Sequence, residues 1–229
     1  HGTAIAGSIV DSGNFDWTAD PKRQPLFNKP DASYKGAVWG KVVPELTGAN
    51  IPFAVRARVC LLRDLGSACS PDNAFAIIQG LETVPLRMKQ HCENAQKVVE
   101  YLKKHKEITR VIYSTEHEKP LADRAKKYLR GGNGPMIGIE LKGGFDAGKK
   151  FIESLKMFYH VANIGDARSL AIHPASTTHS QLNEEELAAS GVTQSYVRLC
   201  IGLEHIDDII EDLDQALNKS SKGTLKAVS

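Results

Sequence analysis

Apolar and polar residues alternate along "YVRLCIGLE", residues 196–204. The apolar positions are Val197, Leu199, Ile201 and Leu203, and the residues between them are Tyr196, Arg198, Cys200 and Gly202. Because successive side chains of a β-strand point to opposite faces, this pattern predicts a strand with one face against a hydrophobic layer. Arg198 is then expected on the other face.

A helical pattern dominates the middle of the chain. Ser70 followed by Pro71 is an N-cap signal, and the pattern runs from there to about Lys104. Pro85 must kink or break it. Beyond Pro85, apolar residues recur at helical spacing on one face: Met88, Cys92, Ala95, Val99 and Leu102. We therefore expect a domain boundary near Pro85, with residues 1–85 before it.

Strand-like and helix-like segments then alternate. They are strand "ITRVIYS", helix near "LADRAKKYL", turn "RGGNGP", strand "MIGIEL", helix "FDAGKKFIESLKMF", strands around "YHVAN" and "SLAIH", helix near "EEELAAS", strand "YVRLCIGLE" and helix "IDDIIEDLDQALN". This alternation predicts an α/β domain over residues 86–220. A frayed tail is expected over residues 221–229.

The first 70 residues have a different character. Turn dipeptides are frequent, "AIAGSIV" is strand-like, and a helical piece is predicted from Phe53 to Leu65. These residues alone are not expected to close a core. The chain begins abruptly at His1 with small, glycine-spaced residues, so we expect it to be cut from a longer protein.

Composition and charge narrow the classes of partner. The 229 residues are 41% hydrophobic and 24% charged, with 29 basic against 27 acidic residues and a net charge of +2. This balance has no electrostatic footprint for nucleic acid. No apolar run approaches the roughly 20 residues needed to cross a bilayer, so we expect a cytoplasmic protein with no membrane partner. Four cysteines without C-x-x-C spacing predict buried, reduced thiols rather than disulfides or a metal site: Cys60, Cys69, Cys92 and Cys200.

The stretch "SLAIHPASTTHSQL", residues 169–182, holds two histidines among hydroxyl side chains. A Ser-His nucleophile site is disfavoured because the serine lacks a glycine-flanked turn and no carboxylate is at hand to orient the histidine. Zinc is disfavoured because His173 and His179 are separated by a proline and lack further ligands. Asn183, Glu186 and Gly191 instead predict a capped helix directly after this stretch. The stretch is therefore interpreted as a polar strand-to-helix corner.

Two further features admit more than one interpretation. The glycines of "GGNGPMIG" lack dinucleotide-binding spacing, since Ile137 occupies the third glycine position, and they are interpreted as a turn. Arg198 fits a surface salt bridge, which the pattern alone favours. It also fits a guanidinium that binds a substrate carboxylate with two parallel hydrogen bonds.

Several longer segments together resemble a known enzyme family. They are "HGTAIAGSIVDSGNFDW", "LETVPLRMKQHCENAQKVVEYL", "GIELKGG", "HVANIGDARSLAIHPASTTHSQL" and "GVTQSYVRLCIGLEHIDDIIEDLDQAL". Over nearly its whole length the chain resembles the Cys/Met-metabolism enzymes that use pyridoxal 5'-phosphate (PLP), which have the aspartate-aminotransferase-like fold (fold type I). Its "ANIGDARSLAIHPASTTHSQL" segment resembles the O-acetylhomoserine sulfhydrylase branch more than the lyases and cystathionine synthases.

The resemblance implies a division of labour along the chain. Residues 1–85 correspond to the C-terminal part of the large PLP-binding domain, and residues 86–220 to the small C-terminal α/β domain. The Schiff-base lysine is implied in a "TKYIGGHGT"-like segment a few residues before His1, and the phosphate-binding residues further upstream. No catalytic residue is therefore expected in this chain, and the missing N-terminal part is an expected partner.

The resemblance also implies roles in substrate binding. Arg198 is implied to bind the substrate α-carboxylate. Asn163 matches a position where many relatives place a serine at the same carboxylate, a departure that leaves its contact open. Ser169 and the "HPASTTH" corner are implied to line the cleft nearby.

The implied reaction is γ-replacement on O-acetylhomoserine, in which acetate leaves Cγ and sulfide adds to give homocysteine. Alternatives within the family are O-succinylhomoserine sulfhydrylase, cystathionine γ-synthase and methionine γ-lyase. An alternative of another class is a non-catalytic chain that only dimerises or docks. The resemblance suggests a homotetramer built from dimers.

Overall fold

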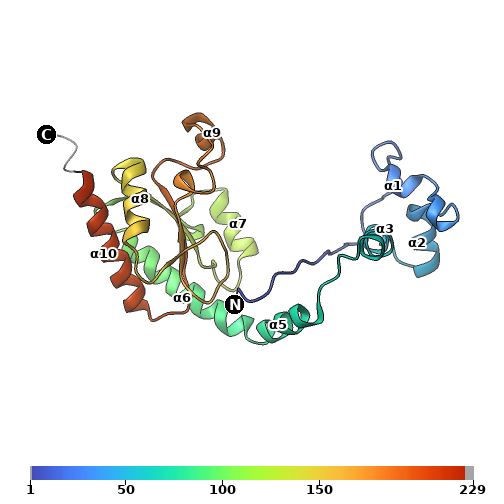
Figure 1. Cartoon of the computed structure of the whole chain (residues 1–229), viewed down its shortest axis with the longest axis horizontal. Helices are drawn as coiled ribbons and strands as arrows, with labels where there is room; N and C mark the ends of the chain where they lie inside the picture. The colour runs from blue at the N-terminus through green and yellow to red at the C-terminus, as the bar shows by residue number, and fades with distance from the viewer. Residues whose placement is uncertain (1, 225–229) are drawn as a thin grey trace. The chain divides into compact units, whose positions relative to one another are not determined.

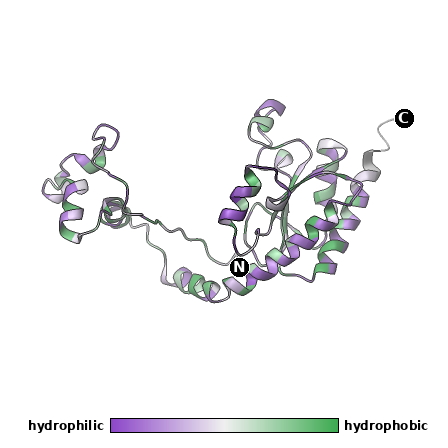
Figure 2. Cartoon of the chain, turned by 180° about the vertical axis from the view of Figure 1, so that it is seen from behind, coloured by the Kyte–Doolittle hydropathy of each residue, from purple (hydrophilic) through white to green (hydrophobic). Residues whose placement is uncertain are grey.

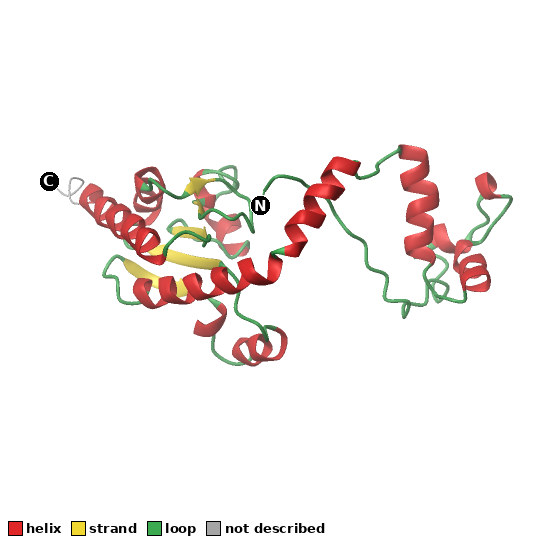
Figure 3. Cartoon of the chain, turned by 90° about the horizontal axis from the view of Figure 1, so that it is seen from below, coloured by secondary structure: helices red, strands yellow, loops and turns green. Residues whose placement is uncertain are grey.

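The computed structural model describes residues 2–224, with side chains through residue 221. The chain divides into two compact units, one of residues 4–77 and one that begins at Ile78. Figure 3 shows all the strands in the second unit, whereas the first consists of helices and loops. The domain boundary expected near Pro85 stays a prediction.

The C-terminal unit is an α/β structure, as predicted. Its helices and strands are α6 (Val84–Leu102), β1 (Ile108–Ile112), α7 (Leu121–Tyr128), β2 (Met136–Leu141), α8 (Gly144–Ser154), β3 (Tyr159–His160), β4 (Leu170–Ile172), α9 (Glu184–Ala189), β5 (Tyr196–Cys200) and α10 (Ile206–Thr224). The sheet order is β1-β2-β5-β4-β3, with only the β3–β4 pair parallel. Helices α6, α8 and α10 lie side by side along the sheet (Figure 1).

A single hydrophobic core fills the space between these helices and the sheet. Fully buried members are Val98 and Leu102 of α6, Ile137 and Ile139 of β2, Phe151 of α8, Leu199 of β5, and Leu213 and Leu217 of α10. In Figure 2 hydrophobic and hydrophilic residues alternate along the helices of this unit, because each turns one apolar stripe to the core. None of the described helices is both long enough and apolar enough to span a membrane.

The N-terminal unit has a much smaller core. Its elements are α1 (Pro25–Asn28), α2 (Trp39–Thr47), α3 (Pro52–Arg56), the π-helical turn Ala57–Leu62 and α4 (Arg63–Leu65), and helix α5 (Pro71–Glu82) begins in it. The buried cluster is Phe27, Trp39 and Val43, and Leu46, Leu61 and Leu65 stay exposed. The helix expected from Phe53 to Leu65 is present as α3, the π-helical turn and α4, which follow one another without a break.

Three structural expectations were wrong. Residues 4–10 form no strand; strands need a neighbour to pair with, and this segment has none among the described residues. Helix α10 continues to Thr224, so the first part of the expected frayed tail is helical, while residues 225–229 lie outside the described residues. Of the four cysteines expected to be buried, only Cys200 is; Cys60 and Cys92 are half-buried and Cys69 is exposed, and all four are free thiols.

Helix α8 is shorter than predicted, and Asp212 explains the difference. The carboxylate of Asp212 on α10 accepts hydrogen bonds from the backbone N–H groups of Lys156, Met157 and Phe158 at 2.9, 2.8 and 3.3 Å. These groups would otherwise bond within the helix. Leu155 accordingly adopts an extended conformation, and the chain turns toward β3.

Candidate functional site

Arg198 lies in the middle of β5 with its side chain on the face predicted from the alternation. Its neighbours Val197 and Leu199 are fully buried in the core, whereas Arg198 itself is half-buried. In the sheet register it pairs with Gly138 of β2 and Ile172 of β4. A strand paired on both sides is a rigid support for a binding side chain.

The guanidinium of Arg198 contacts the segment that leads from β3 to β4. Its Nη2 donates a hydrogen bond of 2.7 Å to the carbonyl oxygen of Ala162. We call residues 161–168 the strap; it includes Asn163, which is exposed. The structure thus brings Arg198 to Ala162, the residue before Asn163 in the sequence.

The salt-bridge interpretation of Arg198 is not supported by the described residues. No carboxylate among them lies within ion-pair distance of this guanidinium. A guanidinium has five N–H donors in a fixed plane. Within residues 2–221 Ala162 is the hydrogen-bond partner found, so donors remain for a ligand oxygen.

Ser169 does not have the exposed position that direct substrate contact requires. It is fully buried, and its hydroxyl donates to Oε2 of Glu204 at 2.9 Å. Oγ of Ser169 also accepts from the N–H of Gly202 at 2.8 Å. Its single O–H donor is engaged by Glu204, and its burial leaves no surface for direct substrate contact. We therefore correct the expectation that Ser169 lines the cleft: it joins two backbone segments.

Cys200 lies on the same side of β5 as Arg198 and is buried. Burial raises the pKa of its thiol, and a backbone hydrogen bond with Gly165 and the Arg198 charge oppose that rise. Burial likewise raises the pKa of Tyr196. Both groups therefore stay neutral near pH 7, and neither is a candidate nucleophile.

The "HPASTTH" corner contains no nucleophilic site. His173 is fully buried; its Nδ1 contacts Oγ of Ser176 at 2.9 Å and its Nε2 contacts the carbonyl oxygen of Gln194 at 2.8 Å. Burial lowers the pKa of His173, which favours the neutral ring. Its two ring nitrogens thus contact a hydroxyl and a carbonyl rather than a carboxylate, and no cluster of metal ligands occurs in the described part of the chain.

The same corner lines a cavity of about 550 Å³, but not one that includes Arg198 or Asn163. The lining residues are Phe145, Lys149, Ile152, Glu153, His160, Ala175, Ser176, Thr177, Ser180, Leu182, Leu187 and Gln194. The corner is thus the wall of a pocket beside α8. The capping box predicted after it is present, with Asn183 Oδ1 accepting from Glu186 N at 3.0 Å and Glu186 Oε2 accepting from Asn183 N at 2.9 Å.

Sequence reasoning missed the residues that hold the end of β5. Nδ1 of His91 donates to the carbonyl of Ile201 at 2.7 Å, and Nδ2 of Asn94 donates to the carbonyls of Gly202 and Glu204 at 3.1 and 3.0 Å. Helix α6 lies more than 100 residues before this loop, with sequence separations of 108 and 110. His91 and Asn94 are three residues apart and so lie on one face of the helix, which the sequence could have indicated. The sequence could not identify the loop after β5 as the partner of that face.

The donors around Arg198 suit a carboxylate and not the aldehyde of PLP. A guanidinium and a neighbouring amide bind anions, whereas PLP needs a lysine amine for its covalent attachment. No lysine takes part in the hydrogen bonds of Arg198 or Ser169. The hydrogen bonds of Arg198 and Ser169 therefore offer no amine for that covalent attachment.

Comparison with known proteins decides the family. The model of the "Cys/Met metabolism PLP-dependent enzyme" family matches residues 1–218. The chain belongs to this PLP-dependent family. The α/β sheet with flanking helices agrees with the fold-type-I assignment made from the resemblance.

The relatives found have consistent names. An "O-acetyl-L-homoserine sulfhydrylase" of Leptospira meyeri is 50% identical over 95% of this chain and 50% of its own length. A "Homocysteine synthase" of Schizosaccharomyces pombe is 44% identical over 95% of this chain and 49% of its own length. The chain thus spans about half the length of these relatives.

A solved structure matches the fold. It belongs to a protein of Campylobacter jejuni assigned as an O-acetylhomoserine (thiol)-lyase, with 40% sequence identity and a TM-score of 0.75 over 86% of this chain and 45% of that one. That protein carries N'-pyridoxyl-lysine-5'-monophosphate at its position 205.

Proposed function

We propose that this chain is the substrate-carboxylate-binding portion of a PLP-dependent O-acetylhomoserine sulfhydrylase. The reaction is γ-replacement: the Cγ–O bond to acetate breaks, and a Cγ–S bond to sulfide forms. The relatives' names support the substrate class. The observation that carries the chain's own part is Arg198 on β5, held by Ala162 with guanidinium donors still free among the described contacts.

Arg198 would bind both oxygens of the α-carboxylate with parallel N–H···O bonds. Such charge-assisted pairs are roughly twice as strong as neutral hydrogen bonds. Because the carboxylate and the amine share Cα, fixing the carboxylate also fixes which Cα bond points in a given direction. Asn163, exposed on the strap beside Ala162, is placed to contact the same carboxylate.

The cofactor contributes chemistry that no side chain of this chain can supply. When bound, PLP accepts the electrons released at the substrate's Cα. This chain's residues bind and orient the substrate. Arg198 holds the carboxylate, and the buried β5 strand keeps that arginine in place.

The test is Arg198→Ala and Arg198→Lys in the full-length protein with O-acetylhomoserine and sulfide. Losing two charge-assisted bonds should lower kcat/KM by about two or more orders of magnitude. Lysine should not restore it, because an ammonium cannot reproduce the planar pair of donors. Unchanged cofactor absorbance is the control for folding. Near wild-type kcat/KM in either variant would refute the role of Arg198.

The acyl donor is tested separately. O-acetylhomoserine and O-succinylhomoserine are each supplied with sulfide, and homocysteine is measured. A preference for the succinyl ester, or release of methanethiol from methionine alone, would contradict the O-acetylhomoserine sulfhydrylase assignment. Neither result would affect the test of Arg198.

A further inference from the structure

Glu204 lies in the loop after β5, and both oxygens of its carboxylate accept hydrogen bonds from Ser169. Its Oε1 accepts from the backbone N–H of Ser169 at 2.7 Å, and its Oε2 accepts from the Ser169 hydroxyl at 2.9 Å. The Ser169 oxygen in turn accepts from the N–H of Gly202 at 2.8 Å. A single carboxylate thus joins the loop after β5 to the start of β4.

This junction is tightly packed. The N–H of Leu203 donates to the carbonyl of Ala167 at 2.8 Å, so backbone and side chain connect the same two segments. A Cβ on Gly202 would collide with Ser169 N, with the carbonyl carbon of Arg168 and with the Glu204 carboxylate. The close approach therefore requires glycine at position 202.

The loop is also held from the opposite side. The carbonyls of Ile201, Gly202 and Glu204 accept hydrogen bonds from His91 and Asn94 of α6. The backbone around Glu204 is thereby fixed on the helical layer. Its carboxylate is therefore a fixed acceptor for Ser169 at the end of the exposed strap.

The strap connects this junction to the arginine. It begins after β3, where Ala162 accepts the hydrogen bond from Arg198, and it ends at Ser169, which Glu204 holds. Within the strap, the carbonyl of Ala167 accepts from Leu203 N–H at 2.8 Å and the Arg168 guanidinium lies 4.8 Å from the centre of the Tyr159 ring, whereas residues 161–165 are exposed. The placement of the Ala162 carbonyl therefore depends in part on how firmly this end of the strap, including Ser169, is held.

We propose that Glu204 is the positioning residue for Arg198, an inference that rests on the proposed carboxylate-binding role of Arg198. Glu204 does not touch the substrate. It fixes Ser169, and through it the strap, so that the Ala162 carbonyl holds the guanidinium in the rotamer that meets the carboxylate. An arginine without that restraint must lose side-chain entropy when it binds.

The test separates carboxylate recognition from general stability. In the full-length protein, Kd values are measured by calorimetric titration for L-norleucine and for n-pentylamine, the same chain without the carboxylate. Glu204→Gln keeps the shape but cannot accept both Ser169 hydrogen bonds. It should raise the Kd of L-norleucine by about tenfold and leave that of n-pentylamine within about twofold.

Two further variants complete the design. Ser169→Ala, which breaks the same junction from the other side, should reproduce the effect if Glu204→Gln does not fold. In an Arg198→Ala background, Glu204→Gln should change neither Kd by more than about twofold, because its target is gone. Tyr101→Phe is the control for lost stability, since its hydroxyl bonds Asp214 and not the junction.

The outcomes distinguish the two proposals. If Arg198→Ala leaves the L-norleucine Kd unchanged, the carboxylate-binding function fails, and this inference fails with it. If Arg198→Ala weakens L-norleucine but Glu204→Gln and Ser169→Ala do not, the function stands and the positioning role is overturned. Equal weakening of both ligands, or full persistence of the Glu204 effect without Arg198, would also overturn it.

Discussion

At the scale of single residues, the exposed surface around Arg198 depends on atoms buried beneath it. Ser169 is the example: its residue type suggested a substrate contact, but its buried hydroxyl is bonded by Glu204 and Gly202. The sequence gives the identity of a polar side chain and not whether its lone pairs are already in use. The Ser169 hydroxyl therefore serves to hold two backbone segments together.

Gly202 should tolerate no side chain. Alanine there would bring Cβ against backbone atoms of Ser169 and Arg168, which cannot move away as a flexible side chain could. We expect Gly202→Ala to lower the free energy of unfolding by about 1–3 kcal/mol. Gly131→Ala is the matched control, because a Cβ there meets nothing within 4 Å, and it should change stability by less than about 0.5 kcal/mol. Equal stability of both variants in urea would contradict the packing seen at Gly202.

His173 should make stability depend on pH below neutrality. Burial lowers the pKa of its imidazole in the folded state, so the unfolded chain binds a proton at a higher pH than the folded one. Its stabilising contribution is therefore complete above the unfolded pKa of about 6.5 and is lost as pH falls below it. The contribution of His105 to stability has the same pH dependence, since burial also lowers its pKa. His173→Gln should flatten part of the fall in Tm between about pH 7 and 5, and an unchanged slope would contradict this assignment.

At the scale of elements, the hydrophobic pattern and the capping residues correctly predicted helices and strands whose bounds depend on nearby sequence. Strand β2 occupies the predicted "MIGIEL", and α9 has its predicted capping box. Other features depended on partners that the local pattern does not show. Helix α8 ends where Asp212 of α10 binds the backbone. Residues 4–10 form no strand because no described strand pairs with them. Arg198 was identified through alternation and resemblance together, whereas Glu204 could be identified only from its contacts.

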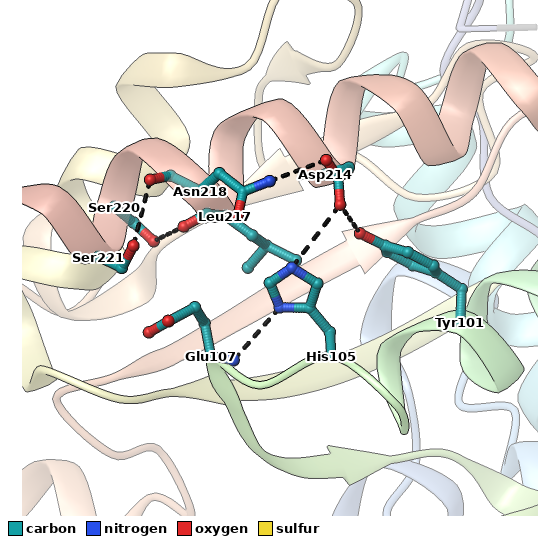
Figure 4. Close-up of polar contacts among 8 residues, drawn as sticks. All are labelled: Tyr101, His105, Glu107, Asp214, Leu217, Asn218, Ser220 and Ser221. Atoms are coloured by element: carbon teal, nitrogen blue, oxygen red, sulfur yellow. Dashed lines mark hydrogen bonds and ion pairs between the residues drawn. The ribbon is translucent and has the colours of Figure 1, made fainter.

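Helices α6 and α10 are joined by a polar contact that Figure 4 shows in detail. The hydroxyl of Tyr101 donates to Oδ1 of Asp214 at 2.7 Å, and Nε2 of His105 lies 3.8 Å from the same oxygen. Burial, followed by the bond to Asp214, raises the pKa of Tyr101. The phenol therefore stays a donor throughout the physiological pH range.

Removing that hydroxyl should loosen the pairing of the two helices. We expect Tyr101→Phe to lower the free energy of unfolding by about 1 kcal/mol, the usual net value of such a bond. Asn218→Ala is the control: its amide bonds Asp214 within α10 at 2.8 Å and does not join two helices. Its expected cost is below about 0.5 kcal/mol in the same denaturant series. A larger loss for Asn218→Ala would show that Asp214 stabilises α10 alone.

At the scale of the whole molecule, this chain corresponds to about half the length of its PLP-dependent relatives. Two compact units and a complete sheet core are present, but the hydrogen bonds around Arg198 include no lysine. The solved relative has its pyridoxyl-lysine at position 205, and this chain covers 45% of that protein.

The 229-residue chain alone should therefore fold its sheet-containing unit yet hold no PLP covalently. After incubation with PLP, borohydride reduction and dialysis, we expect only the low, scattered labelling of surface lysines that the urea-unfolded chain also shows. The reason is that a stable Schiff base requires a lysine held against the cofactor ring by the surrounding site, and the described contacts offer no such arrangement. Peptide mass mapping measures the result. One stoichiometric pyridoxyl-lysine, present in the folded chain and lost on unfolding, would show that this half of the enzyme contains an anchoring site of its own.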